Sequence, residues 1–261
     1  MMNNNHTLIN QDMPKPVTEA DYAGRIMIPL DYASAEDARG LLKELAGIPC
    51  YMKVGMQLFY AAGPDFVREL KELGYKVFLD LKLHDIPNTV AGGAASITRL
   101  GVDMFNVHAA GGGAMLAAAR EGMERALSQP GISGSVRPKL IAVTQLTSTS
   151  QAVMNGEIGI PGSVEDTVLR YAALAAASGL DGVVASPWEV SALKAAQGRG
   201  FITVTPGIRP AGSDKGDQAR VMTPREAFAQ GTDYVVIGRP ITAAAEPRLA
   251  LESILKDLMS Q

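Results

Sequence analysis

The stretch VFLDLKLHDIPNT, residues 77–89, joins a short apolar run to a charged turn and a helix start. Residues 77–81 are apolar except for one aspartate, which is typical of a parallel strand buried on both faces. Pro87 follows the turn, and proline is favoured at the first position of a helix. The stretch therefore predicts one strand followed by one helix.

Similar apolar runs recur along the chain. The expected strands are 26–30, 51–55, 77–81, 104–108, 140–144, 182–185, 202–205 and 234–237. The segments between them have helical patterns: Ser34 is suited to cap one helix, Pro64 to begin another and Gly74 to end it, and 167–177 and 224–230 look the same. Eight such units in about 240 residues predict an α/β protein with a single (β/α)8 TIM barrel over residues 21–261.

An open, doubly wound sheet is the alternative architecture. No G-x-G-x-x-G follows the first expected strand, which argues against a dinucleotide-binding version of that sheet. Two expected loops, 146–162 and 208–217, are long enough to serve as lids over a site, with Gly212 and Gly216 as candidate hinges in the second.

Composition argues against several classes of partner. The net charge of -3, from 24 basic and 27 acidic residues, gives no general electrostatic basis for binding nucleic acid or an anionic membrane. No apolar stretch approaches the roughly 18 residues of a membrane helix. Cys50, the single cysteine, is expected to be buried, and its lack of an internal disulfide partner fits a reducing cytosol. Residues 1–20 are polar and are expected to form a flexible N-terminal leader.

Charged residues gather at the carboxyl ends of the first three expected strands, where barrels of this kind carry their chemistry. They are Asp31, Lys53, Asp80 and Lys82. Asp80 and Lys82 are two apart, so on a regular strand they point to the same side, and burying them is costly unless they are paired. We therefore expect an alternating network of carboxylates and ammonium groups that forms a site.

Other roles are possible for these charges. A plug of salt bridges closing the barrel mouth is one. A divalent cation held by Asp31, Asp80 and Asp85 is another, although the two lysines would repel it. Asp85 is also placed to cap the helix that begins near Pro87, and spacing alone does not decide between these roles.

The last two expected strands end in glycine and arginine, at the loops where such barrels commonly bind phosphate. Gly207 with Arg209 and Gly238 with Arg239 supply close backbone approach and bidentate charged hydrogen bonds. Two surface arginines after ordinary glycines are the alternative. Gln218 follows the 208–217 loop and is a candidate for one more hydrogen bond when that loop closes.

These motifs resemble the orotidine 5'-phosphate decarboxylase family, most closely its bacterial branch. Residues 80–89 match its signature D-x-K-x-x-D-I-x-N-T, and Asp31, Lys53, the run 144–148, TPGIR at 205–209 and IGRPIT at 237–242 follow in the family's order. The resemblance covers nearly the whole chain after the leader. It implies decarboxylation of orotidine 5'-phosphate to uridine 5'-phosphate, the last step of de novo pyrimidine nucleotide synthesis, in the cytoplasm and without cofactor or metal.

The resemblance also implies a role for each site residue. Lys82 would donate the proton to the ring carbon, Asp80 would lie beside the departing carboxylate, and Asp31 and Lys53 would bind ribose hydroxyls, with Lys53 also ordering the charged catalytic network. Asp85, also catalytic, and Thr89 would complete the partner subunit's site in a homodimer. The remaining ligands would be Thr147 for the pyrimidine and Arg209, Gln218, Gly238 and Arg239 for the phosphate. His108 is expected to be structural, and His84 is not expected to be catalytic.

Two rival functions stay open. Decarboxylases of the 3-keto-L-gulonate 6-phosphate type resemble this chain in the D-x-K-x-x-D run but use magnesium and carry a glutamate where this chain has Lys53. A non-catalytic nucleotide-binding barrel is the other, and the full set of charged residues argues against it.

Overall fold

Eight parallel strands form a closed barrel in which each strand pairs with its sequence neighbours and β8 pairs with β1. The computed structural model describes residues 17–132, 136–211 and 222–260. The strands are β1 Ile26–Pro29, β2 Tyr51–Gly55, β3 Lys76–Leu83, β4 Met104–His108, β5 Lys139–Val143, β6 Gly182–Val184, β7 Ile202–Thr205 and β8 Tyr234–Val236. The predicted barrel is confirmed, and the predicted strands differ from these only at their ends.

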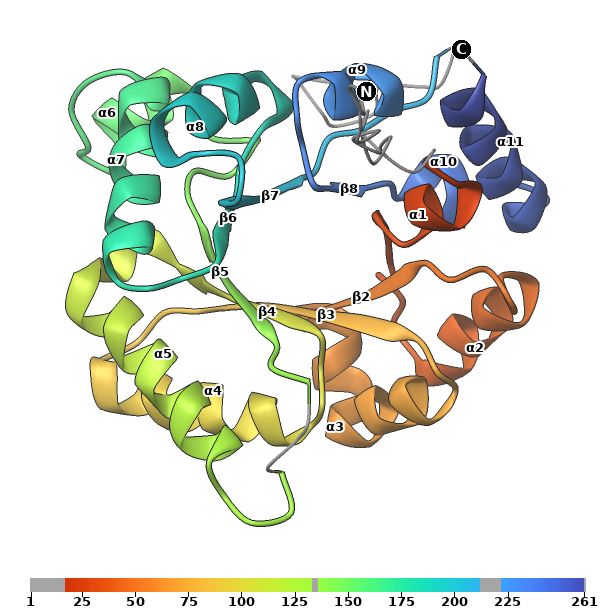
Figure 1. Cartoon of the computed structure of the whole chain (residues 1–261), viewed down its shortest axis with the longest axis horizontal. Coiled ribbons are helices and arrows are strands. Elements are labelled where there is room, and N and C mark those ends of the chain that lie inside the picture. The colour runs from red at the N-terminus through yellow and green to blue at the C-terminus, as the bar shows by residue number, and fades with distance from the viewer. Residues whose placement is uncertain (1–16, 133–135, 212–221, 261) are drawn as a thin grey trace, which may run out of the picture.

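Helices surround the barrel (Figure 1). They are α1 Glu19–Ala23, α2 Ala35–Glu44, α3 Met56–Glu72, α4 Pro87–Arg99, α5 Gly112–Leu127, α6 Gln151–Gly156, α7 Val164–Ala177, α8 Val190–Gln197, α9 Pro224–Ala229, α10 Arg239–Thr242 and α11 Pro247–Met259, with short 3₁₀ turns at Ala109–Gly111 and Pro187–Glu189. Helix α1 begins inside the segment 1–20 that was expected to be a leader. Within the described residues, no helix is long and apolar enough to cross a membrane.

Local sequence explains most helix ends. The Ser34 hydroxyl accepts the Asp37 N–H at 3.2 Å and caps α2 as predicted. A helical segment begins at Pro64 as predicted, but it is the second part of α3, which already begins at Met56. The helix is interrupted at Gly63, where φ is 69° and ψ is -173°, and Pro64 restarts it. The long 146–162 loop contains α6.

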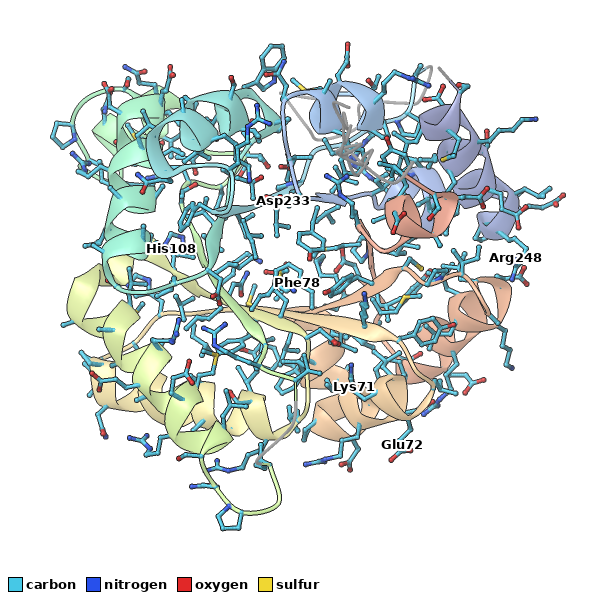
Figure 2. All side chains as sticks on the ribbon, in the orientation of Figure 1. Lys71, Glu72, Phe78, His108, Asp233 and Arg248 are labelled. Atoms are coloured by element: carbon cyan, nitrogen blue, oxygen red, sulfur yellow. The ribbon has the colours of Figure 1, made fainter. Side chains whose placement is uncertain are left out.

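Apolar side chains fill the barrel interior below the carboxyl ends of the strands. Met27, Tyr51, Phe78, Met104, Ile141 and Val204 form this inner cluster, and Figure 2 shows Phe78 within the ring of strands. Side chains two residues apart on a strand share a face. The residues two positions after Tyr51, Phe78 and Met104 therefore form the next layer toward the carboxyl end. They are Lys53, Asp80 and Asn106, so a polar layer lies next to the inner apolar cluster, on the side of the carboxyl ends of the strands.

Three aspartates tie the amino ends of the strands together. Asp103, Asp181 and Asp233 directly precede β4, β6 and β8. Their carboxylates accept the N–H groups of Val77, Leu140 and Thr203 in the preceding strands, each at 2.7 Å. Each carboxylate also pairs with a cation: Lys71, Arg137 and Lys194, respectively. The same arrangement thus closes three successive strand pairs at the end of the barrel away from the charged cluster.

Replacing Asp181 by alanine is expected to lower the free energy of unfolding by about 2 kcal/mol, because the Leu140 N–H loses its acceptor and Arg137 keeps Glu124 but loses its bonds to Asp181. Urea denaturation measures the change. Asp65→Ala is the control: this carboxylate is 91% exposed and, among the described residues, pairs only with Arg68 one helical turn away, so a change within about 0.5 kcal/mol is expected. If both variants lose the same free energy of unfolding, the hydrogen bonds of Asp181 add no stability.

Candidate active site

The first three strands bring four charged side chains together in alternating order. Lys53 Nζ lies 3.4 Å from Asp31 Oδ1 and 3.3 Å from Asp80 Oδ2. Lys82 Nζ lies 2.7 Å from Asp80 Oδ1. The exposed fraction of the side chain is 11% for Lys53 and 13% for Asp80, but 60% for Asp31. The network is therefore buried at its centre and open to solvent at Asp31.

Strand β3 is not regular where it carries Lys82. It pairs with β4 at Leu79↔Phe105 and next at Leu83↔Val107, with a register shift between these pairs. Lys82 has a φ of 53°, and among the described residues it is the one non-glycine residue with positive φ. Lys82 therefore reaches Asp80 from a bulge in left-handed conformation, rather than by the regular alternation that the sequence argument assumed.

Asn106 on β4 faces this bulge and was not among the residues predicted for the site. Its Oδ1 accepts the backbone N–H of Lys82 at 2.8 Å, and its Nδ2 donates to Asp80 Oδ1 at 2.7 Å. The residue is 1% exposed. Its position two residues after Met104, on an expected strand, is the sequence feature that could have identified it.

The surroundings set the charge of two groups in the site. Burial alone would raise the pKa of Asp80, but the ammonium groups of Lys53 and Lys82 and the hydrogen bonds from Lys82 and Asn106 hold it below the ordinary value. Asp80 is therefore a carboxylate at neutral pH. Burial, with smaller contributions from the charges of His84 and Lys82, lowers the pKa of His108. Its ring stacks on that of His84 with centroids 5.5 Å apart.

A cavity of about 500 Å³ connects the charged network to the ends of β7 and β8. Its lining includes Asp31 and Lys53 on one side and Gly207, Arg209, Gly238 and Arg239 on the other. Gly207 has a φ of 80°, which favours glycine. A Cβ atom on Gly238 would lie 3.2 Å from Pro29 Cγ, so a larger residue at this position would crowd Pro29. Arg209 is 8% exposed, whereas Arg239 is exposed at the rim.

Some predicted residues do not join this group. Asp85 and Thr89 are exposed, and within the described chain Asp85 accepts only the Ile86 N–H, at 2.6 Å. Ile86, not Asp85, is the N-cap of α4, so Asp85 does not cap that helix. Thr147 lies in a turn after β5 and is partly buried. Gln218 and the candidate hinges Gly212 and Gly216 lie outside the described residues.

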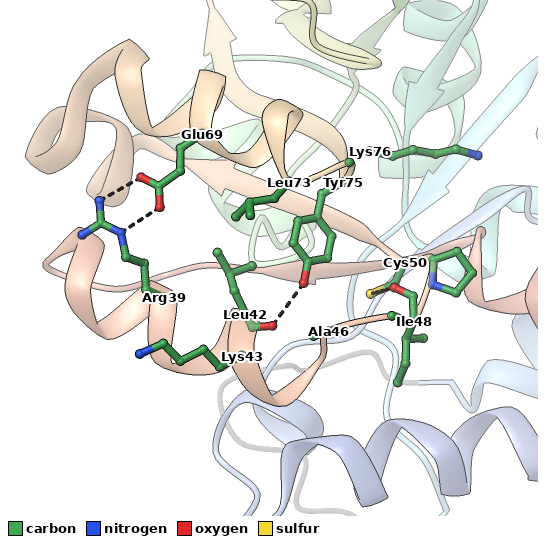
Figure 3. Close-up of a pocket in the computed structure, with 13 residues that line it drawn as sticks. Arg39, Leu42, Lys43, Ala46, Ile48, Cys50, Glu69, Leu73, Tyr75 and Lys76 are labelled. Atoms are coloured by element: carbon green, nitrogen blue, oxygen red, sulfur yellow. Dashed lines mark hydrogen bonds and ion pairs between the residues drawn. The ribbon is translucent and has the colours of Figure 1, made fainter.

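A second cavity, of about 570 Å³, opens at the amino ends of β2 and β3 (Figure 3). Two of its charged groups pair with each other: Arg39 donates two hydrogen bonds of 2.8 Å to Glu69. Cys50 lines it and is 1% exposed, as predicted, and burial raises the pKa of its thiol to about 12. No residue predicted for the site lines this cavity. The described residues also contain no cluster of three or more His, Cys, Asp or Glu side chains arranged for a metal ion.

The geometry suits a substrate with a phosphate at one end and a reacting group at the other. Two arginines and two glycines lie at the β7 and β8 end of the cavity, and such groups bind phosphate oxygens. A carboxylate between two ammonium groups lies at the β2 and β3 end. Fixed charges in this arrangement can stabilise charge that develops during a reaction.

Comparisons with known proteins agree on one family. A model of the Orotidine 5'-phosphate decarboxylase / HUMPS family matches residues 24–254. The orotidine 5'-phosphate decarboxylase of Lactococcus lactis subsp. cremoris (strain SK11) is 51% identical over 234 residues, which cover 89% of this chain and 97% of that protein. The one from Vibrio cholerae serotype O1 is 51% identical over 235 residues, covering 90% and 98%.

A solved structure extends this likeness to the fold. The crystal structure of orotidine 5'-phosphate decarboxylase from Lactobacillus acidophilus aligns with a TM-score of 0.79 at 41% sequence identity. The alignment covers 90% of this chain and 99% of that one.

Proposed function

Because this chain belongs to the orotidine 5'-phosphate decarboxylase / HUMPS family and is a carboxy-lyase, we propose that it converts orotidine 5'-phosphate to uridine 5'-phosphate and carbon dioxide. This reaction is the last step of de novo pyrimidine nucleotide synthesis. The observation that carries the proposal is the Asp31–Lys53–Asp80–Lys82 network beside a cavity that ends in two arginines.

Lys82 is the proposed proton donor. When the bond between the ring carbon C6 and the carboxylate breaks, carbon dioxide leaves and the electron pair stays on C6, in the plane of the ring. The ring π-system delocalises this pair poorly, so a fixed positive charge beside C6 stabilises it. The Lys82 ammonium supplies that charge and then transfers one proton to C6, which forms the C–H bond of the product.

Asp80 and Lys53 set the environment of that ammonium. The Asp80 carboxylate holds Lys82 Nζ at 2.7 Å and is itself held by Lys53 at 3.3 Å. A substrate carboxylate bound next to Asp80 meets like charge, which disfavours the ground state relative to the neutral carbon dioxide that departs. Lys53 keeps Asp80 ionised and, with Asp31 at the open end of the network, is proposed to bind ribose hydroxyls.

The rest of the substrate is assigned to the other end of the site. Arg209, Gly238 and Arg239 are proposed to hold the phosphate, and Gln218 is proposed to join them. Thr147, in the turn after β5, is proposed to contact the pyrimidine. Because the phosphate is remote from C6, its binding energy is available to position the ring and exclude water.

We propose that no cofactor or metal takes part, so a chelator is expected to leave the turnover of orotidine 5'-phosphate unchanged. The decrease in ultraviolet absorbance as the ring loses its carboxylate measures the rate, with and without EDTA and with added magnesium. The same mixtures with 3-keto-L-gulonate 6-phosphate form the comparison. Turnover of that sugar phosphate, abolished by EDTA and restored by magnesium, would replace the proposal with the related metal-dependent reaction.

The proposed working form is a cytoplasmic homodimer in which Asp85 and Thr89 contribute to the partner subunit's site. The contiguous exposure of residues 84–89 supports this, as does Ile86, which is 66% exposed. Asp85 makes no ion pair with the network of its own chain within the described residues, so its carboxylate is available to a second copy.

A further inference from the structure

We infer that Asn106 is a positioning residue whose side-chain amide fixes both the backbone of Lys82 and the Asp80 carboxylate, and thereby places the Lys82 ammonium. The inference rests on the proposed decarboxylation, in which Lys82 is the proton donor. Asn106 acts through Lys82 and Asp80 and needs no contact with the substrate.

The backbone at Lys82 needs a partner because the sheet does not supply one. Asp80, Leu81 and Lys82 lie opposite Asn106 alone, between the Leu79↔Phe105 and Leu83↔Val107 pairs. A left-handed conformation costs free energy for any residue with a Cβ atom and persists only where the surroundings impose it. The Lys82 N–H is turned to Asn106 Oδ1 at 2.8 Å, so the side chain replaces the missing ladder bond.

The same amide holds the carboxylate. Asp80 Oδ1 accepts one hydrogen bond from Asn106 Nδ2 and one from Lys82 Nζ, each 2.7 Å long. The amide therefore closes a ring that runs from the Lys82 backbone through Asn106 and Asp80 to the Lys82 ammonium. Within this ring the ammonium has little freedom to move relative to its own backbone.

Asparagine is suited to this place by its two different ends. One end must accept from an N–H group and the other must donate to a carboxylate, and a side-chain amide does both. The reversed amide would set its oxygen against Asp80 and its NH₂ group against the Lys82 N–H, so the two partners fix one orientation. The residue is 1% exposed, so water does not replace either bond when the amide is lost.

Loss of the amide should therefore displace the Lys82 ammonium from the reacting carbon. A displacement of about 1 Å in a catalytic group typically costs roughly 10²-fold in rate. The phosphate and ribose contacts lie on other strands, so KM should change little while kcat falls.

Two substitutions separate positioning from general stability. Asn106→Leu keeps a side chain branched at Cγ but removes both polar ends, and we expect kcat to fall roughly 10²-fold at every pH. Asn106→Asp keeps the size and places two carboxylates side by side, so one of them takes up a proton with a raised pKa. Protonated, the new side chain donates to Asp80 and accepts from Lys82 as asparagine does.

The activity of the Asn106→Asp enzyme should depend on pH. Below the raised pKa of the carboxyl pair the Asn106→Asp enzyme resembles wild type, and above it the hydrogen bond to Asp80 is lost. The ratio of kcat between Asn106→Asp and wild type should therefore fall as the pH rises, whereas the ratio for Asn106→Leu should stay low and flat. Thr98→Val, which removes a buried hydroxyl that bonds within α4, is the matched control and should keep the wild-type kcat.

The experiment measures kcat and KM for orotidine 5'-phosphate across pH, at a temperature below the melting point of every variant. A folded Asn106→Leu enzyme with wild-type kcat overturns the inference. An Asn106→Asp enzyme whose kcat relative to wild type is independent of pH also overturns the inference. This measurement is the deciding one if Asn106→Leu does not fold. If the wild-type enzyme leaves orotidine 5'-phosphate unchanged, the proposed function fails and the inference fails with it. An active wild type with unaffected Asn106 variants refutes the inference alone.

Discussion

Lys82→Ala is expected to lower the turnover of orotidine 5'-phosphate by roughly 10⁴-fold or more, because one substitution removes both the proton donor and the charge that stabilises the carbanion. The fold should persist. The left-handed backbone at φ 53° is strained by the Cβ atom, which lysine and alanine both have. The substitution therefore adds no new strain. Initial rates under saturating substrate, with circular dichroism of the same sample, measure the two properties separately.

Lys76→Ala is the matched control for this loss. Lys76 begins the same strand at the opposite end of the barrel and is exposed, with its ammonium over the Tyr51 ring. Its removal should leave turnover within about twofold of wild type, as expected for a surface substitution away from the site. Near-normal turnover in Lys82→Ala would remove Lys82 from the mechanism.

Arg239→Ala is expected to weaken the binding of uridine 5'-phosphate by roughly 10²-fold, which corresponds to about 2–3 kcal/mol for hydrogen bonds to a charged group. The melting temperature should change little because Arg239 is exposed at the rim of the cavity. Isothermal titration calorimetry with uridine 5'-phosphate and with uridine isolates the phosphate contribution. The affinity for uridine, which lacks the phosphate, should not change.

Arg68→Ala supplies the control for a lost surface arginine. Arg68 lies on α3 and pairs with Asp65, and it lines neither end of the cavity. Its loss should leave both affinities as they are. An Arg239→Ala protein that binds uridine 5'-phosphate as tightly as wild type would contradict the phosphate assignment.

The fold was predictable from the sequence because its determinants are local. Each strand is a short apolar run that must be buried on both faces, and eight of them close a barrel. The helix start at Pro64 is also a local feature, because Gly63 interrupts α3 and the proline begins its second part; the first part, from Met56, was not predicted.

The charged residues of the site were predictable for a related reason. Asp80 and Lys82 stand in an otherwise apolar strand, where they need partners. The irregular backbone that joins them was not predictable. Lys82 is left-handed and donates its backbone N–H to Asn106, which follows it by 24 residues and lies on another strand. Nothing in residues 80–82 themselves indicates a bulge, and a contact between distant residues cannot be recognised from the local sequence.

Orotidine 5'-phosphate labelled in its carboxylate carbon would show directly whether the protein is a decarboxylase. The purified protein is mixed with this substrate in EDTA, and the labelled carbon dioxide and the uridine 5'-phosphate are both quantified. We expect rapid release of labelled carbon dioxide in equal molar amount to uridine 5'-phosphate, with no added metal or cofactor. Recovery of the nucleotide with its label intact, with or without magnesium, would contradict this expectation.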